Sequence, residues 1–178
     1  RVMRNKISEE LFALQKKESV RGMKFPRPYY LFWEKYGRSL KGEMDEICGL
    51  LKKTAWFEFD TAQYDSNYAD KLKIEVGKQS MLGKGYDGCL LISIAEGVDE
   101  NELIKLMEYI KGQEELVVPV FSVKCEEEVE RIKSVIERYH YCRIAEGEEY
   151  TAKEQTDIIR QELEQCGFEL EDAQAVLE

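Results

Sequence analysis

The sequence predicts an α/β protein in which five strands form one mainly parallel sheet with helices on both of its faces. Apolar runs with the length of strands alternate with amphipathic segments with the spacing of helices along most of the chain. The run at 88–94 is apolar almost without a break, which is typical of a strand buried on both faces of a parallel sheet. The helical segments are long enough to join parallel strands by right-handed crossovers. Together these observations predict a three-layer sandwich.

The N-terminal segment is predicted to be a helix followed by a linker. Residues 6–18 have the helical spacing of apolar side chains, and Pro26 and Pro28 then prevent the helix from continuing. We therefore assign residues 1–24 to an N-terminal helix and linker, and residues 25–147 to the α/β core.

The core contains five segments with the composition of strands, at 29–33, 56–59, 88–94, 116–122 and 141–144. Segments in which apolar residues have the spacing of a helix lie between these strands, at about 39–53, 68–82, 99–111 and 129–136. Pro119 lies in the fourth strand, so we expect it at a position that donates no hydrogen bond within the sheet.

A different pattern follows the fifth strand. Thr151 and Glu154 form a capping box just before an apolar run, and Gly167 stands where a helix would end. A second helical pattern starts at Phe168 and stops at the end of the chain, as it would in a fragment of a longer protein. We predict a small, truncated helical unit over residues 148–178.

Composition indicates a soluble globular protein with a protein partner more readily than a nucleic-acid partner. The chain has 43% hydrophobic and 35% charged residues, and no apolar run approaches the roughly 20 residues that a membrane helix needs. The net charge of −10 disfavours binding to phosphate backbones. The N-terminal segment is basic, which we interpret as a solvated helix face and a loop.

The cysteines and the single histidine do not indicate a metal site. The five cysteines have no close pair, and Cys48, Cys89 and Cys142 lie within apolar patterns typical of buried thiols. Free thiols fit a reducing cytoplasm. With His140 as the only histidine and no C-x-x-C motif, no zinc site is expected.

The segment after the first strand has the strand, loop and helix order of the phosphate-binding pattern G-x-x-x-x-G-K-[ST]. Gly37 takes the place of the second glycine, Arg38 that of the lysine and Ser39 that of the serine or threonine. The first glycine position falls on Phe32.

This loop departs from what phosphate binding requires. Glycines let backbone N–H groups close around phosphate oxygens without a Cβ in the way. Phe32 and Tyr36 are expected to put bulk there, and Glu34 puts negative charge where phosphates would lie. The sequence therefore indicates a degenerate phosphate loop.

The order of elements resembles the AAA+ branch of the P-loop ATPases, which have five parallel strands, a phosphate loop after the first strand and a helical lid after the fifth. The resemblance spans residues 25–178, and the segment from Glu149 to Gly167 is similar to the start of the family's lid. It implies a P-loop NTPase-like sandwich with the strand order 5-1-4-3-2. An antiparallel sheet or the order 2-1-3-4-5 would contradict it.

The resemblance also implies positions for the catalytic groups, and here the sequence departs from the family. The third strand should end in Asp-Glu, which bind Mg²⁺ and orient water, but Ser93 and Ile94 stand there. Ser122 matches the polar residue that senses phosphate at the end of the fourth strand. Arg160 is a candidate lid sensor by its location alone, and a solvated helix surface is the commoner use of such a residue.

Two damaged motifs favour a catalytically inactive AAA+-like module that holds a protein partner or a neighbouring ATPase subunit, with no cofactor or metal. One alternative is a working nucleotide-binding domain that binds ATP with Mg²⁺. In it Lys35, Arg38 and Lys41 would supply charge and Ser39 would lie at a helix N-terminus.

Two further alternatives fit the sequence less well. A receiver-like signalling domain would use Ser122, but Ser93 stands where it needs an aspartate. A small-molecule enzyme could use Asp60 and Asp65, although such residues commonly form turns and caps. We expect His140 to pack, not to catalyse.

Overall fold

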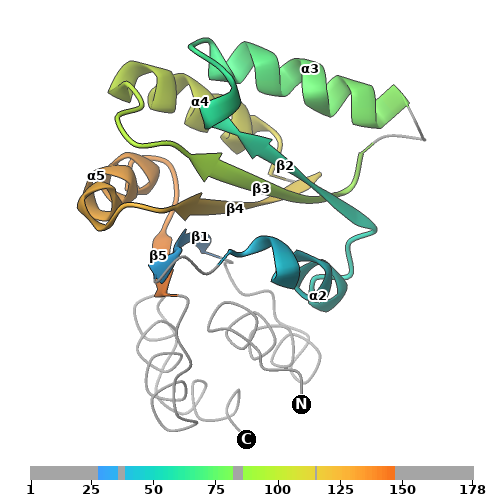
Figure 1. Cartoon of the computed structure of the whole chain (residues 1–178). Coiled ribbons are helices and arrows are strands. Elements are labelled where there is room, and N and C mark those ends of the chain that lie inside the picture. The colour runs from blue at the N-terminus through green and yellow to red at the C-terminus, as the bar shows by residue number, and fades with distance from the viewer. Residues whose placement is uncertain (1–27, 36–38, 82–85, 115, 147–178) are drawn as a thin grey trace, which may run out of the picture.

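The computed structural model describes residues 28–35, 39–81, 86–114 and 116–146, and places five parallel strands in one sheet (Figure 1). The strands are β1 (Tyr29–Trp33), β2 (Ala55–Asp60), β3 (Gly88–Ile94), β4 (Val117–Val123) and β5 (Cys142–Glu146). They are ordered β2-β3-β4-β1-β5, and every neighbouring pair is parallel. The predicted order 5-1-4-3-2 is confirmed. The receiver-like alternative is wrong, because that fold has the order 2-1-3-4-5.

Helices cover both faces of the sheet, as predicted. They are α2 (Met44–Leu50), α3 (Tyr68–Met81), α4 (Glu100–Gly112) and α5 (Glu126–Glu137), with short 3₁₀ turns η2 (Lys41–Glu43) and η3 (Thr61–Gln63). Figure 1 shows α3 and α4 on the side of the sheet opposite α2. The buried residues of α3, α4 and α5 belong to one hydrophobic cluster, and those of α2 belong to a second.

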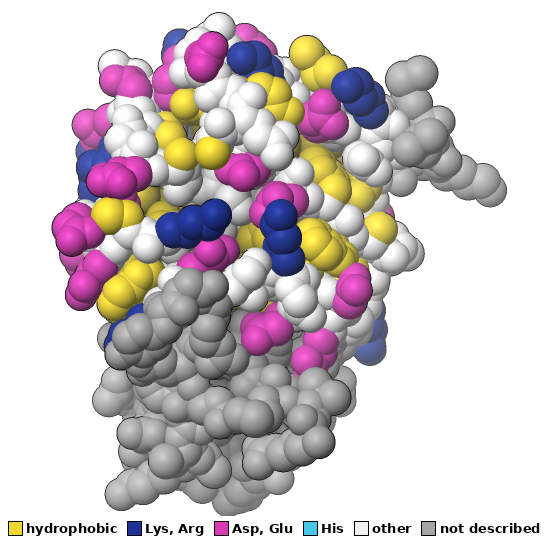
Figure 2. Space-filling model, in the orientation of Figure 1, with side chains coloured by type: hydrophobic (Ala, Val, Ile, Leu, Met, Phe, Trp, Pro, Cys, Tyr) yellow, Lys and Arg dark blue, Asp and Glu magenta, His cyan; other side chains and the backbone are white. Residues whose placement is uncertain are grey.

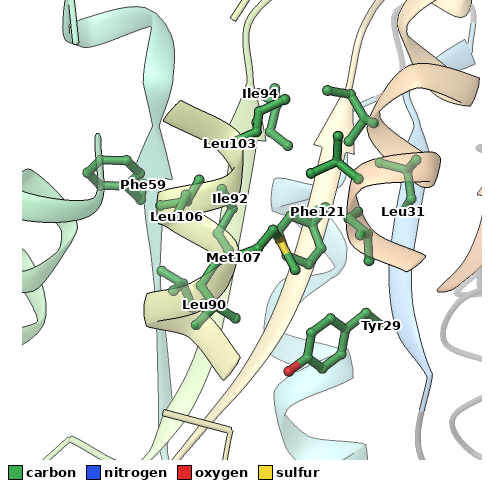
Figure 3. Packing of buried hydrophobic residues seen from close by; sticks show 14 of the residues in the cluster. Tyr29, Leu31, Phe59, Leu90, Ile92, Ile94, Leu103, Leu106, Met107 and Phe121 are labelled. Carbon is green, nitrogen blue, oxygen red and sulfur yellow. The ribbon is translucent and has the colours of Figure 1, made fainter. Parts of the chain in front are cut away.

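Strand β3 explains why the two clusters are separate. All seven of its residues are buried. Leu90 and Ile92 point into the larger cluster, whereas Cys89 and Leu91 point into the α2 cluster, because successive side chains of a strand face opposite sides. Figure 3 shows Leu90 and Ile92 packed near Met107 of α4. The unbroken apolar run therefore marks a strand covered on both faces.

Gly88 and Pro119 have special positions near the starts of the central strands. A Cβ on Gly88 would lie 2.2 Å from the backbone oxygen of Ala55, so only glycine fits where β3 begins beside β2. Pro119 lies in the central strand β4, and the pairing of β4 with β1 starts one residue later, with Val120 opposite Tyr30.

The helix after β1 is shorter than predicted. The pattern predicts a helix over 39–53, but α2 begins at Met44 and ends at Leu50. The η2 turn precedes α2, and the positive φ of 56° at Lys52 follows it. The buried Leu40 anchors the start of this segment in the α2 cluster. The apolar spacing thus detected the helix, and local backbone geometry set its ends.

Several predicted elements lie outside the described residues. They include the N-terminal helix and linker at 1–24 and the helical unit at 148–178 with its cap at Thr151. Within the part of the chain that the structure describes, no helix combines the length and apolar character needed to cross a membrane.

Candidate functional site

A cleft of about 670 Å³ opens at the carboxyl edge of the sheet. A second hollow of about 380 Å³ shares Glu34, Asp60, Ser93 and Lys124 with it, so the two form one continuous site. The ends of β1, β2, β3 and β4 and the start of α5 line this site. The crevice outside the carboxyl ends of parallel strands is where open α/β sheets bind ligands.

Sheet register brings together two residues that the sequence predicted separately. Ser93 of β3 and Ser122 of β4 are directly opposite in the parallel ladder, and Asp60 of β2 is opposite Ser93. The hydroxyl oxygens of Ser93 and Ser122 lie 3.2 Å apart. Both serines are buried, at 8% and 2% exposure. Two expected strand-end residues therefore form one pair on the floor of the cleft.

The serine pair belongs to a larger polar cluster at the carboxyl edge of the sheet. Ser122 donates to Ser93, Ser93 donates to the Glu58 carboxylate of β2 at 3.0 Å, and Glu34, the residue after β1, lines the same cleft. Lys41 forms an ion pair with Glu58 at 2.8 Å. We call the four residues Glu34, Ser122, Ser93 and Glu58 the edge chain.

Glu34 is the most deeply placed acid of the edge chain, with 8% of its surface exposed. Its backbone N–H donates to the Val123 carbonyl at 2.8 Å, which extends the pairing of β1 with β4 and fixes the residue at the cleft. Burial raises the pKa of its carboxyl group, because a desolvated carboxylate is less stable. Lys124, the Leu40 N–H and the Ser122 hydroxyl oppose this rise, and Glu58 adds to it.

Two residues that hold the cleft together were not predicted from the sequence. Thr61 is 1% exposed, and its hydroxyl donates to the Ser93 carbonyl at 3.0 Å and accepts from the Ala95 N–H at 2.8 Å. Glu58 is the polar residue between Phe57 and Phe59 in β2. Its acidic side chain within an apolar strand was the available signal, but no motif singled it out.

The basic residues assigned to phosphate binding have other contacts in the structure. Lys35 lies over the Trp33 ring, 5.2 Å from its centre, and Lys41 pairs with Glu58. The Ser39 hydroxyl accepts a hydrogen bond from the Lys41 N–H at 3.2 Å. Gly37 and Arg38, together with Tyr36, lie outside the described residues.

Phe32 does not crowd the cleft, contrary to the expectation from the loop pattern. Its side chain is 1% exposed and packs in the α2 cluster with Leu40 and Met44. The strand continues to Trp33, so the first position of the pattern falls inside β1, where alternation points Phe32 into the core. Ile94 is also buried, and lines the cleft at the end of β3.

Acidic side chains outnumber basic ones around the cleft. The acids are Glu34, Glu58, Asp60, Glu96, Glu126, Glu127 and Glu128, and the bases are Lys41 and Lys124. Three of these acids occupy the first turn of α5. Negative charge at this density disfavours a phosphate group in the same space. Among the described residues, no cluster of three or more potential metal ligands is present.

Other candidate residues have structural contacts. Asp60 caps the η3 turn by accepting from the Ala62 N–H at 3.0 Å. His140 stacks on Tyr29 with ring centres 4.2 Å apart, beside the start of β1 and away from the cleft. Cys48, Cys89 and Cys142 are buried free thiols, as their apolar surroundings predicted.

The protein is therefore an all-parallel α/β protein with the strand order 5-1-4-3-2. A polar cleft lies at the carboxyl edge of its sheet. No family model matches the sequence, and no curated protein matches it.

The solved structures that are similar to the chain include the following two. One is Rif2 in complex with the C-terminal domain of Rap1, with a TM-score of 0.47, 9% identity, and coverage of 88% of this chain and 61% of that chain. The other is the Orc1 protein of Aeropyrum pernix in complex with DNA, with a TM-score of 0.43, 13% identity, and coverage of 93% and 50%. The chain thus spans between half and two thirds of these proteins, and likeness at this level assigns neither family nor function.

Proposed function

We propose that the protein is a catalytically inactive AAA+-like module that acts in protein–protein interaction or assembly, as a holder of a partner chain or of a neighbouring ATPase subunit. One observation carries the proposal. The edge chain places two serines and two glutamates at the carboxyl edge of β1, β2, β3 and β4, where this strand order would bind phosphate and Mg²⁺.

Metal binding is the first function that the edge chain opposes. Mg²⁺ needs carboxylate and phosphate oxygens in near-octahedral geometry. Ser93 offers a neutral hydroxyl that is already bonded to Glu58 and Ser122, and Ile94 offers no polar group to orient water. We infer that β3 ends without the groups that phosphoryl transfer requires.

Phosphate binding is opposed independently. The buried Glu34 lies on the cleft floor, and Lys41 is neutralised by Glu58. The N-terminus of α2 also attracts phosphate only weakly. The helix has seven residues and carries Asp45 and Glu46 in its first turn. The negative charges of these acids offset the positive N-terminal end of the helix dipole.

A protein is the partner that the charge pattern favours. The net charge of −10 opposes a phosphate backbone. Figure 2 shows acidic and basic side chains interspersed on one face, with hydrophobic side chains between them and no continuous basic stripe over the part drawn in colour. Mixed surfaces of this kind suit protein contacts. The free thiols favour a reducing cytoplasm as the location.

Nucleotide binding is the rival function, and the size of the cleft favours it. A cavity of about 670 Å³ falls within the range of small-molecule sites. Lys124 lines both hollows, and Lys35 and Arg38 follow β1 in the sequence. ATP would have to bind beside Glu34, and Arg38 would have to supply the main charge.

Equilibrium binding of ATP and ADP, with and without Mg²⁺, together with ATP turnover, tests the proposal. We expect weak or no binding of Mg·ATP and no turnover above a buffer control. Tight binding that is lost in Arg38→Ala would favour the rival function. Robust turnover that disappears in Ser39→Ala would overturn the proposal.

A further inference from the structure

Strand β2 forms one outer edge of the sheet. It stands at the end of the order β2-β3-β4-β1-β5, and among the residues that the structure describes it pairs with β3 alone. Figure 1 shows β2 between α3 on one side and α2 on the other. An edge strand presents a row of backbone N–H and C=O groups that another extended chain can pair.

The backbone of β2 alternates between groups that face β3 and groups that face outward. The Ala55 carbonyl faces β3, because a Cβ on Gly88 at the start of β3 would lie 2.2 Å from its oxygen. Phe59 belongs to the same set of alternate residues, and only 1% of its surface is exposed. The N–H and C=O groups of Trp56 and Glu58 therefore face outward, on the side where no described strand pairs with β2.

Strand β2 lacks several features with which natural edge strands block such pairing. Its sequence AWFEFD contains neither lysine nor proline. All six residues pair with β3 in unbroken register, so no bulge turns the strand away. The charge at its middle, Glu58, is held in the ion pair with Lys41. The β2 edge is therefore open to a further strand.

The two faces of β2 differ in chemistry, because successive side chains point to opposite sides of the sheet. Trp56 packs against the α2 cluster, and Glu58 and Asp60, on the same face as Trp56, line the smaller hollow of the cleft. Phe57, on the opposite face, is partly buried against the larger cluster. A strand beside β2 would thus place alternate side chains next to acids and the others next to an aromatic ring.

We propose that the β2 edge binds an extended segment of a partner protein by strand addition, and that basic and apolar residues alternate in this segment. The inference rests on the proposed function and gives the chemistry of the partner. Basic side chains would lie beside Glu58 and Asp60, and apolar side chains beside Phe57. The net charge of −10 favours a basic segment and disfavours a second copy of this chain, because two copies repel each other.

A peptide of alternating lysine and valine, long enough to span the six residues of β2, is the probe. We titrate it into the whole ¹⁵N-labelled chain and measure amide hydrogen exchange by NMR. We expect saturable binding and slower exchange of the Trp56 and Glu58 N–H groups. Binding should be lost when the backbone nitrogens of the peptide are methylated, because that peptide keeps its charge and cannot donate to a strand. A peptide with glutamate in place of lysine should not bind.

A pair of protein variants tests the contribution of charge. Asp60→Asn keeps an acceptor for the Ala62 N–H, so the η3 turn keeps its cap while the carboxylate charge is removed. It should weaken binding of the lysine peptide roughly two- to fivefold, as expected for an exposed ion pair. Glu130→Gln removes an exposed acid from α5 and is the matched control, with no change in binding expected.

Four results would overturn the inference. They are no binding of the lysine peptide, equal binding of the methylated peptide, slower exchange on another element in place of β2, and a dimer in sedimentation velocity whose exchange is slowed at β2 without peptide. The methylated peptide would show that charge alone attracts the probe, and the dimer would show that a second copy occupies the edge. ATP turnover, which would overturn the proposed function, is measured without peptide, so the two failures are distinguishable.

Discussion

At the scale of residues, the cleft depends on single polar side chains that satisfy backbone groups inside the fold. Thr61 shows this most clearly, because one hydroxyl bonds both the Ser93 carbonyl and the Ala95 N–H. It joins the η3 turn to the end of β3, and so holds the β2 and β3 sides of the cleft together. Thr61 itself is 1% exposed, so its hydroxyl is shielded from water.

Thr61→Val should therefore lower the free energy of unfolding by about 1–3 kcal/mol, since it keeps the shape of the side chain and leaves buried polar groups without a partner. Chemical denaturation measures this change. Thr61→Ser, which keeps the hydroxyl, is the control and should retain most of the stability. Equal losses in the two variants would show that the methyl group matters and the hydrogen bonds do not.

Glu34 gives a dependence of stability on pH with a definite sign. Its pKa is raised in the folded protein, so its protonated form contributes stability that is fully present below the usual value of 4.5. That contribution is lost as pH rises through the raised pKa of the folded state. The stability of the unmodified protein relative to Glu34→Gln should therefore fall over this window, as denaturant midpoints at each pH would measure.

A matched control for this pH series is Glu96→Gln, which removes an exposed acid from the same cleft. The comparison separates a specific effect of Glu34 from the general reduction of negative charge. A relative stability that rises with pH would contradict a raised pKa for Glu34.

At the scale of elements, the helices begin and end where local backbone chemistry allows, and α4 is the clearest case. Asp99 caps it by accepting hydrogen bonds from the N–H groups of Asn101 and Glu102 at 2.9 and 3.3 Å. Its inner face buries Leu103, Leu106, Met107 and Ile110 against the sheet. The apolar spacing predicted this helix to within one residue at each end. The helix after β1 was predicted too long, because apolar spacing does not distinguish the η2 turn from an α-helix.

Asp99→Ala should cost about 1 kcal/mol of stability, because two N–H groups of the first turn lose their acceptor. Asp99→Ser keeps a side-chain oxygen at this position and should recover most of the loss. Thermal or urea unfolding measures both variants. A cost in Asp99→Ser as large as that in Asp99→Ala would indicate that the charge of the aspartate, and not the capping bond, stabilises α4.

At the scale of the whole molecule, the sheet order was predictable and the site was predictable only in part. The alternation of strands and helices, with the AAA+ resemblance, led to the order 5-1-4-3-2. Ser93 and Ser122 could be named because they end strands. Their contact with each other depends on the register of β3 against β4, and the place of Glu58 depends on that of β2 against β3. Phe32 was misplaced for a different reason: the phosphate pattern laid its first position inside β1, where the side chain faces the α2 cluster.

The arrangement of the whole edge leads to a prediction about attempts to restore catalysis. Under the proposed function, metal ligation and phosphate binding would fail at different places, the first at the end of β3 and the second in the loop after β1 and on the acidic cleft floor. Ser93→Asp would add a possible metal ligand but also another negative charge beside Glu34 and Glu58. Arg38→Lys would restore the lysine of the phosphate pattern but would not supply the metal ligand that β3 lacks.

We expect each single variant to hydrolyse ATP no faster than a buffer control. Phosphate release measures the hydrolysis, and thermal unfolding verifies that each variant is folded. Turnover gained in Ser93→Asp alone would mean that the loop already binds nucleotide and that a single missing carboxylate keeps the protein inactive.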